Sequence, residues 1–201
     1  MLPQAFNNVI DALSMLPGVG PRTAERYAYY LFKSNDKISD NIALALSNLH
    51  SSVKSCPVTF ALIDAEDEVS PFYSDPERDK TTILVVEEPL DIYAIEQTRG
   101  YKGTYHVLGG AISPIDGVTP EQLHIGELIK RANNDNVKEI IIATNPSVEG
   151  ESTALYLERI LHEQNPNLKL TRLARGLPLG IDLSYADQIT LSAALENRTD
   201  L

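Results

Sequence analysis

Short apolar runs alternate with helix-like stretches along residues 83–174, and this alternation constrains the fold more than any other feature. The runs are ILVV at 83–86, YHVL at 105–108, EIIIA at 139–143 and LKLTRLA at 168–174. Between them lie the stretches PLDIYAIEQT, QLHIGELIKRA and STALYLERILHEQ, whose lengths are typical of helices. Buried strands that alternate with helices predict a parallel sheet covered on both faces, and therefore the α/β class.

The first third of the chain predicts helices instead of a sheet. Apolar residues recur at helical spacing over residues 6–13, 24–31 and 42–53, so each stretch presents one apolar stripe. The sequence LPGVGP, with two glycines, separates the first two stripes and predicts a tight turn. The chain therefore combines a helical N-terminal segment with an α/β body.

The glycine turn has the composition of a phosphate site. Gly18 and Gly20 allow backbone angles closed to other residues, and Pro21 suits the first position of the next helix. The N–H groups of the turn and of the helix N-terminus would converge there, with Arg22 and Arg26 on one face of the helix. This pattern indicates a helix-hairpin-helix that contacts backbone phosphates and not bases. An ordinary helical hairpin, whose glycines only permit the turn, is the alternative.

Charge limits how strongly such a site binds DNA. The chain carries a net charge of −11, but residues 1–60 hold five basic and four acidic side chains, a balance of +1, so the remainder carries −12. We therefore expect any nucleic-acid contact to be local and modest in strength. An acidic, solvated surface without such a contact fits the same total.

Cysteine usage and hydropathy indicate a cytoplasmic protein. The single cysteine, Cys56, excludes an intrachain disulfide and agrees with a reducing compartment. The stretch MLPQAFNNVIDAL lacks the layout of a signal peptide, and no apolar run approaches the roughly 20 residues of a membrane helix. We expect no membrane partner.

Acidic side chains follow two of the predicted strands. Glu87 and Glu88 come directly after ILVV, with Asp91 one turn into the next helix, and Glu149 and Glu151 follow EIIIAT. Because neighbouring parallel strands end at one crevice, these carboxylates predict an oxygen-rich pocket suited to Mg²⁺. For a single acid, a solvated side chain would be the better interpretation.

Two acid groups at strand ends within an α/β unit resemble a Toprim domain, the magnesium-binding module of topoisomerases, primases and some nucleases. In the catalytic members the later strand ends in an Asp-x-Asp pair, whereas this sequence has ATN at 143–145, with Asn145 where the first of those acids is expected. Because phosphoryl transfer depends on metals held in rigid geometry, the departure weakens the case for catalysis more than that for binding one metal ion.

Five segments together resemble the RecR family of bacterial recombination mediators over nearly the whole chain. They are LPGVGPRTAERYAYYL, SDPERDKTTILVVEEPLDIYAIEQT, GTYHVLGGAISPIDGV, ATNPSVEGESTALYL and TRLARGLPLGIDLSYADQITLSAALENR. The resemblance implies a helix-hairpin-helix domain at 1–54, a small zinc-ribbon-like insert at 55–79, a Toprim domain with a parallel sheet at 80–175 and a C-terminal Walker-B-like arm at 176–201. In that arm Ile181 stands where family members usually have a small residue.

The resemblance also implies a function. Family members are not enzymes; they form dimers and ring-like tetramers, and act with RecO, and in some pathways RecF, to help load RecA onto single-stranded DNA. It implies DNA contact at Gly18, Gly20, Arg22 and Arg26, and metal or partner binding at the acids Glu87, Asp91, Glu149 and Glu151.

The insert is where the chain departs from the family. The family has two Cys-x-x-Cys pairs before Ser-Asp-Pro, and the matching positions here are Cys56, Thr59, Ser70 and Tyr73. One thiol, two hydroxyls and a phenol do not form a tetrahedral zinc site, so we predict a degenerate module without zinc. Apolar packing must then replace the metal, and the candidates are Val58, Phe60, Leu62, Val69, Phe72 and Tyr73.

The leading hypothesis is a non-catalytic, DNA-binding recombination mediator. The alternative is a stand-alone Mg²⁺-dependent Toprim nuclease, against which the missing Asp-x-Asp pair counts. A degenerate family member that serves only as an assembly scaffold would have no affinity for DNA. The sequence leaves open the oligomer size and which protein, RecO, RecF or neither, is the working partner.

Overall fold

The computed structural model describes residues 2–134, 136–178, 180 and 182–198. The chain divides into two compact units, Met1–Lys54 and Ser55–Leu201, which we describe one at a time.

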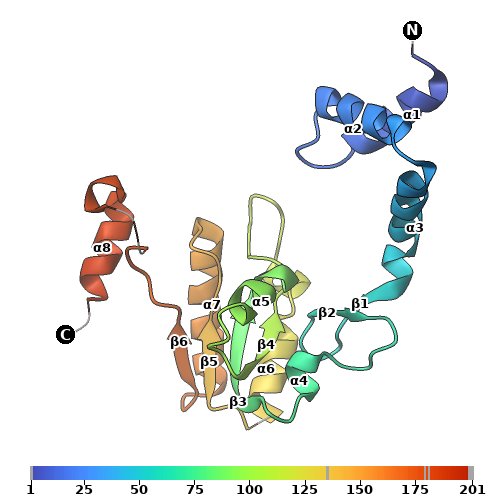
Figure 1. Cartoon of the computed structure of the whole chain (residues 1–201). Helices are drawn as coiled ribbons and strands as arrows, with labels where there is room; N and C mark the ends of the chain where they lie inside the picture. Colours follow the sequence, from blue (N-terminus) through green and yellow to red (C-terminus); the bar gives the residue numbers. More distant parts are fainter. Residues whose placement is uncertain (1, 135, 179, 181, 199–201) are drawn as a thin grey trace. The chain divides into compact units, whose positions relative to one another are not determined.

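The first unit consists of three helices, α1 (Gln4–Ser14), α2 (Pro21–Lys33) and α3 (Asp36–Ser52) (Figure 1). Helix α1 packs on α2, where Ala24 and Ala28 are buried and the Phe6 ring meets Phe32 edge-on at 6.3 Å between ring centroids. Helix α3 buries none of its residues, so its predicted apolar stripe lies exposed. The unit thus contains the helical hairpin that the sequence predicts, together with a helix whose apolar face is uncovered.

The second unit is built on a parallel sheet, as predicted. Its strands are β3 (Asp79–Val86), β4 (Gly103–Val107), β5 (Glu139–Ile142) and β6 (Lys169–Arg172), in the order β4-β3-β5-β6 (Figure 1). In the register, Val85 of the central strand β3 stands beside His106 of β4 and Ile142 of β5. The carboxyl ends of all four strands therefore meet along one edge of the sheet.

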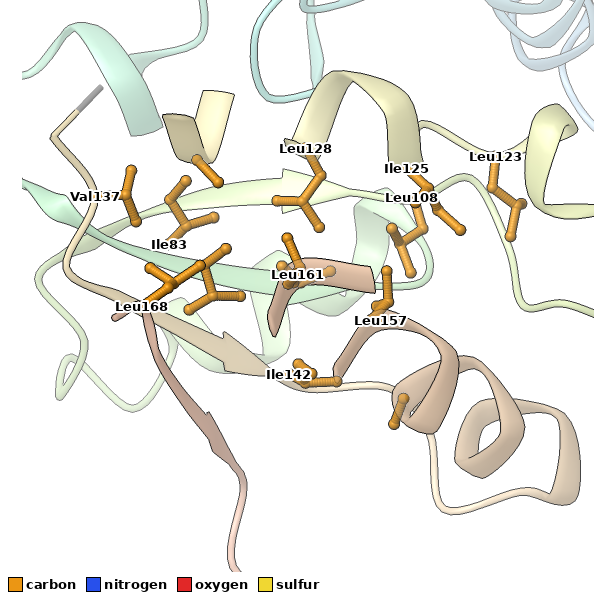
Figure 2. Packing of buried hydrophobic residues seen from close by; sticks show 14 residues of the cluster. Ile83, Leu108, Leu123, Ile125, Leu128, Val137, Ile142, Leu157, Leu161 and Leu168 are labelled. Carbon is orange, nitrogen blue, oxygen red and sulfur yellow. The ribbon is translucent and has the colours of Figure 1, made fainter. Parts of the chain in front are cut away.

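Helices cover both faces of this sheet. Helices α6 (Ile125–Asn134) and α7 (Val148–Gln164) pack on one face, and α5 (Pro89–Glu96) packs on the other. Alternate residues of β3 contribute to hydrophobic cores on the two faces of the sheet. Ile83 and Val85 belong to the larger core, which includes Leu128, Leu157 and Leu161 (Figure 2). Leu84 and Val86 belong to the smaller core, together with Ile92, Tyr105 and Val107. Helix α7 begins four residues before the predicted stretch STALYLERILHEQ, because Ser147 caps it by accepting the Gly150 N–H.

The insert belongs to the second unit and has no core of its own. Strand β1 (Val53–Ser55) pairs with β2 (Leu62–Asp64), and a short helix, α4 (Pro71–Ser74), follows. Ala61 joins the smaller core of the sheet, against which Phe60 and Phe72 also pack. The prediction that the insert is held by its own apolar residues is therefore wrong for Leu62, which is exposed, while its neighbour Ile63 is buried. So short a segment cannot bury enough apolar surface alone, and it packs on the adjacent sheet instead.

Three further elements complete the described chain. They are η1 (Pro120–Gln122), η2 (Leu183–Tyr185) and α8 (Gln188–Glu196), the last two in the C-terminal arm.

The predicted departure at Ile181 lies outside the described residues. Among the residues that the structure describes, no helix combines the length and the hydrophobicity needed to cross a membrane.

Candidate functional site

The glycine hairpin of the first unit forms a tight turn between α1 and α2. The Val19 N–H donates to the Leu16 carbonyl oxygen at 3.1 Å, and Gly18 has φ +78°, a backbone region that favours glycine. Gly20 is different: it caps α2 with φ −78° and ψ 167°, angles that other residues also adopt. The expectation that both glycines supply unusual backbone angles is therefore correct only for Gly18. A Cβ at Gly20 would meet nothing within 4 Å, so this side of the turn is open to a ligand.

Two arginines extend from the helix that begins at this turn. Arg22 and Arg26 are exposed on α2, and neither forms an ion pair within the described part of the chain. Pro21, the first residue of α2, has no N–H, and the Thr23 and Ala24 N–H groups both donate to the Gly20 carbonyl oxygen at 3.0 Å. Of the first helical turn, the Arg22 N–H is left without an acceptor in the described part of the chain, at the positive end of the helix. The hairpin thus presents one helix N–H group and two unpaired guanidinium groups, a combination suited to phosphate.

At the carboxyl edge of the sheet, Glu87 follows β3 directly and is buried, with 7% of its surface exposed. Its carboxylate accepts two hydrogen bonds from Asn145, which follows β5: the backbone N–H reaches Oε1 at 2.9 Å and the side-chain Nδ2 reaches Oε2 at 2.6 Å. The structure therefore brings the first predicted acid to the residue that stands in place of the Asp-x-Asp pair.

The other predicted acids lie in the first turns of α5 and α7. The Asp91 carboxylate accepts the Glu88 N–H at 2.9 Å in a capping box at the start of α5. Glu149 lies in the first turn of α7, half-buried. Within the described ranges, no three His, Cys, Asp or Glu side chains come together as a group that could hold a metal ion. The four acids share one edge of the sheet, as expected, but they do not converge there.

Glu151 pairs with two arginines at the root of the C-terminal arm. Arg172, the last residue of β6, donates to both of its carboxylate oxygens, at 2.8 and 3.0 Å, and Arg175 pairs with the same carboxylate. Hydrogen bonds from these two guanidinium groups lower the pKa of Glu151 to about 2. We call these contacts the arm-root ion pairs.

The degenerate zinc positions surround the sulfur of Cys56. Cys56, Thr59 and Ser70 are fully buried, and the Cys56 Sγ accepts N–H groups from Val58, Thr59 and Ser70 at 3.3–3.4 Å. Burial alone would raise the pKa of this thiol, but the hydrogen bonds from Thr59 and from the three backbone groups lower it below its usual value.

The two hydroxyl groups at positions 59 and 70 already accept hydrogen bonds, and the Tyr73 ring lies against two cations. Thr59 Oγ1 accepts the Ala61 N–H, and Ser70 Oγ accepts the Phe72 N–H. The Tyr73 ring lies under the Lys80 ammonium, 4.8 Å from the ring centroid, and beside the Arg131 guanidinium. This set of donors does not fit tetrahedral Zn²⁺, which requires four ligands such as thiolate or imidazole.

Comparison with known proteins identifies the family. The family model described as "RecR, helix-hairpin-helix" matches residues 6–50, "Toprim domain" matches 81–174 and "RecR, C-terminal" matches 176–199. The protein "Recombination protein RecR" of Moorella thermoacetica is 47% identical over 199 residues, 99% of this chain and 98% of the relative. The proteins of the same name from Thermobifida fusca and Heliobacterium modesticaldum are 47% and 48% identical over 201 and 198 residues, at least 98% of each chain. The chain belongs to the RecR family.

Within this RecR chain, four side chains have partners that the sequence did not predict. Asn145 was recognised as a departure from the catalytic pattern, but not as the partner of Glu87. Arg172 and Arg175 lie in TRLAR, and pairing them with Glu151 requires the register of β6 beside β5, which no sequence signal provides. Arg131 is buried beneath β4 and donates to the Thr104 hydroxyl and the Tyr105 carbonyl oxygen. Apart from its place in a predicted helix, no sequence signal indicated that this arginine would be buried.

Proposed function

We propose that this chain is a non-catalytic, DNA-binding recombination mediator that helps load RecA onto single-stranded DNA in recombinational repair. Its relatives carry the name "Recombination protein RecR". The main support for DNA binding is the glycine hairpin, in which Gly18 has φ +78° and the exposed, unpaired Arg22 and Arg26 lie at the start of α2. Phosphate contacts of this kind carry no base information, so the binding is independent of sequence. The proposed place of action is the cytoplasm.

The proposed working form is a homodimer or homotetramer. Four large apolar side chains follow one face of α3 and are exposed: Ile38, Ile42, Leu46 and Leu49. An uncovered apolar helix face of this kind is typical of an interface between subunits. An oligomer would place several hairpins on one DNA strand, and this multivalency offsets the acidic net charge of −11.

RecO, and in some pathways RecF, is the proposed protein partner. The carboxyl edge of the sheet supports a protein contact here: Leu90 after β3, Ile115 after β4 and Val148 after β5 are all largely exposed. Ile115 lies between Ser113 and Val118, whose antiparallel bridge closes a hairpin loop that projects from the domain in Figure 1. Exposed apolar residues beside acidic ones suit a protein surface better than the phosphate backbone of DNA.

The test is to replace both hairpin arginines. Arg22→Ala with Arg26→Ala should weaken binding to labelled single-stranded DNA by about ten-fold or more at moderate salt, equally for several unrelated sequences, and should reduce the dependence of affinity on salt. Fluorescence anisotropy over a range of KCl concentrations measures both effects.

The matched control removes the same charge from the second unit. Lys130→Ala with Lys138→Ala changes the net charge by the same amount at two exposed positions, and should bind DNA nearly as the unchanged protein does. Equal loss in both double variants would show that overall charge, and not the hairpin, determines binding. Incubation of labelled DNA with protein and Mg²⁺ separates the nuclease alternative, which predicts cleavage that disappears in Glu87→Gln.

A further inference from the structure

The carboxylate of Glu87 stands at the place where a Toprim domain would bind a metal ion, and its surroundings are fixed by hydrogen bonds. The side chain is buried, both of its oxygens accept N–H groups of Asn145, and its own carbonyl oxygen accepts the N–H groups of Gly109 and Gly110 at 2.9 and 3.0 Å. Glu87 therefore joins the loop after β4 to the loop after β5.

The space beside this carboxylate is also taken by the backbone of α7. A Cβ at Gly150 would collide with the Asn145 carbonyl oxygen and lie 2.7 Å from Glu87 Oε1. The Gly150 carbonyl oxygen in turn accepts the Thr144 hydroxyl at 2.9 Å. Glycine at position 150 is thus required by close approach, and the first turn of α7 closes against the pair of Glu87 and Asn145.

Two of the other predicted acids are engaged away from Glu87, and no three His, Cys, Asp or Glu side chains in the described part of the chain form a group that could hold a metal ion. Asp91 accepts the Glu88 N–H, and Glu151 is neutralised by the arm-root ion pairs. A magnesium site in a protein normally takes one or two carboxylates with open positions for water and substrate. Here both Glu87 oxygens accept N–H groups of Asn145, and the acids of this edge do not come together as a ligand group, so the residues present do not fit Mg²⁺ as a resident ion.

We propose that the Asn145 amide takes the place of a metal ion at Glu87, so that this Toprim domain holds its acidic centre together without Mg²⁺. The amide supplies the positive end of an N–H dipole where a catalytic relative would supply a cation between two carboxylates. Asparagine differs from aspartate in this respect because its amide donates a hydrogen bond to the Glu87 carboxylate, whereas a second carboxylate would repel it. Asn145 is therefore a positioning residue: it fixes the loop after β5 and the start of α7 against β3.

The test converts the amide into the second acid. In Asn145→Asp, two carboxylates face each other at hydrogen-bond distance, and one of them must take up a proton or a cation. In metal-free buffer at pH 8 the melting temperature of the full chain should fall by about 3 °C or more, since Glu87 is buried, and millimolar Mg²⁺ should restore it. The unchanged protein should show no Mg²⁺-dependent shift beyond that of KCl at equal ionic strength.

Two control variants separate charge from lost hydrogen bonds. Asn145→Ala removes the amide without adding a charge, so its melting temperature should fall but should not respond to Mg²⁺. The exchanged pair, Glu87→Gln with Asn145→Asp, restores one amide and one carboxylate at the original net charge. It should regain stability in metal-free buffer and lose the response to Mg²⁺.

A direct readout uses Mn²⁺ as a paramagnetic substitute for Mg²⁺. Electron paramagnetic resonance should show about one additional bound Mn²⁺ per chain in Asn145→Asp compared with the exchanged pair, and no such difference between the unchanged protein and the exchanged pair. A Mg²⁺-dependent rise in the melting temperature of the unchanged protein as large as that of Asn145→Asp would overturn the proposal. So would Asn145→Asp with full stability in metal-free buffer. Neither result depends on the hairpin, so DNA binding is tested separately.

Discussion

At the scale of single residues, backbone groups of the insert surround the sulfur of Cys56. Its sulfur accepts three backbone N–H groups from both halves of the insert, and the two hydroxyls at neighbouring positions satisfy further backbone donors. Each buried N–H left without a partner costs about 1–3 kcal/mol, so these bonds join the two halves of the insert and stabilise it. The result is a buried, hydrogen-bonded polar cluster in the insert, which packs on the sheet.

His106 is a second buried residue with consequences for stability. Its Nε2 donates to the His124 carbonyl oxygen at 2.8 Å, and its Nδ1 has no hydrogen-bond partner in the described part of the chain. Burial, with the nearby Arg131 and His124, lowers the pKa of His106 to about 3, although the bond to His124 opposes this. The Phe60 ring packs edge-on against it at 5.3 Å, so water cannot readily solvate a charged imidazole.

The pH dependence of unfolding tests this environment. In the unfolded chain His106 takes up a proton near pH 6.5, whereas in the folded chain it stays neutral to about pH 3, so stability is full above pH 6.5 and falls as the pH drops below it. The slope from this residue approaches 1.4 kcal/mol per pH unit. Urea titrations at pH 5.0–7.5 should show it in the unchanged protein and in His162→Gln, an exposed control, but not in His106→Gln. Parallel slopes in all three would contradict the assignment.

At the scale of elements, the arm-root ion pairs connect α7 to the end of β6. Arg172 ends the strand and Arg175 lies three residues after it, just before the arm, and both reach Glu151 in the first turn of α7. An acid that the family pattern assigns to the metal centre is thus used to fix the direction in which the chain leaves the sheet.

Glu151→Gln should loosen this junction without unfolding the unit. Because Glu151 is about a third exposed, solvent screens the pairs and the cost in unfolding free energy should stay below about 1 kcal/mol. Hydrogen exchange followed by mass spectrometry should nevertheless show several-fold faster exchange over residues 170–176. Glu163→Gln, at an exposed position near the end of the same helix, should leave that segment unchanged. Lowering the pH from 4.5 toward 2 should reproduce the loosening in the unchanged protein, since the pairs are lost as Glu151 takes up its proton.

At the scale of the whole molecule, two properties of the first unit indicate that the protein does not act as a single copy. Its hairpin carries few charges for DNA binding, and α3 leaves a full apolar face exposed. Both are explained if several copies associate, since association covers the apolar face and brings the weak phosphate contacts onto one strand.

Leu46→Asp should reduce the number of subunits in the assembly. A charge in the middle of the exposed apolar stripe opposes burial against a second copy, whereas Asn48→Asp adds the same charge on α3 at a polar position. Native mass spectrometry reports the subunit number and any bound metal together. Among the unchanged protein, Leu46→Asp and Asn48→Asp, only Leu46→Asp should form a smaller assembly. None of the three proteins should contain zinc. An unchanged subunit number would exclude this face as the interface, and about one zinc per chain would contradict the predicted loss of the zinc site.

The sequence by itself determined the class of every major element. Helical periodicity indicated the three N-terminal helices, short apolar runs indicated the four strands of the sheet, and glycine and proline located the hairpin, because these signals depend on local backbone geometry. The last of these strands, β6, is only half-buried at Leu170 and Thr171 and exposed at both ends. The order of residues along the chain placed the acids after two of these runs, but did not show their partners. Only the tertiary structure decided that Asn145 meets Glu87, that Arg172 and Arg175 meet Glu151, and that the insert packs on the sheet through Ala61 and not Leu62. Those contacts join residues far apart in the chain, and they depend on strand register and on which side of a short strand faces the core, neither of which a local pattern encodes.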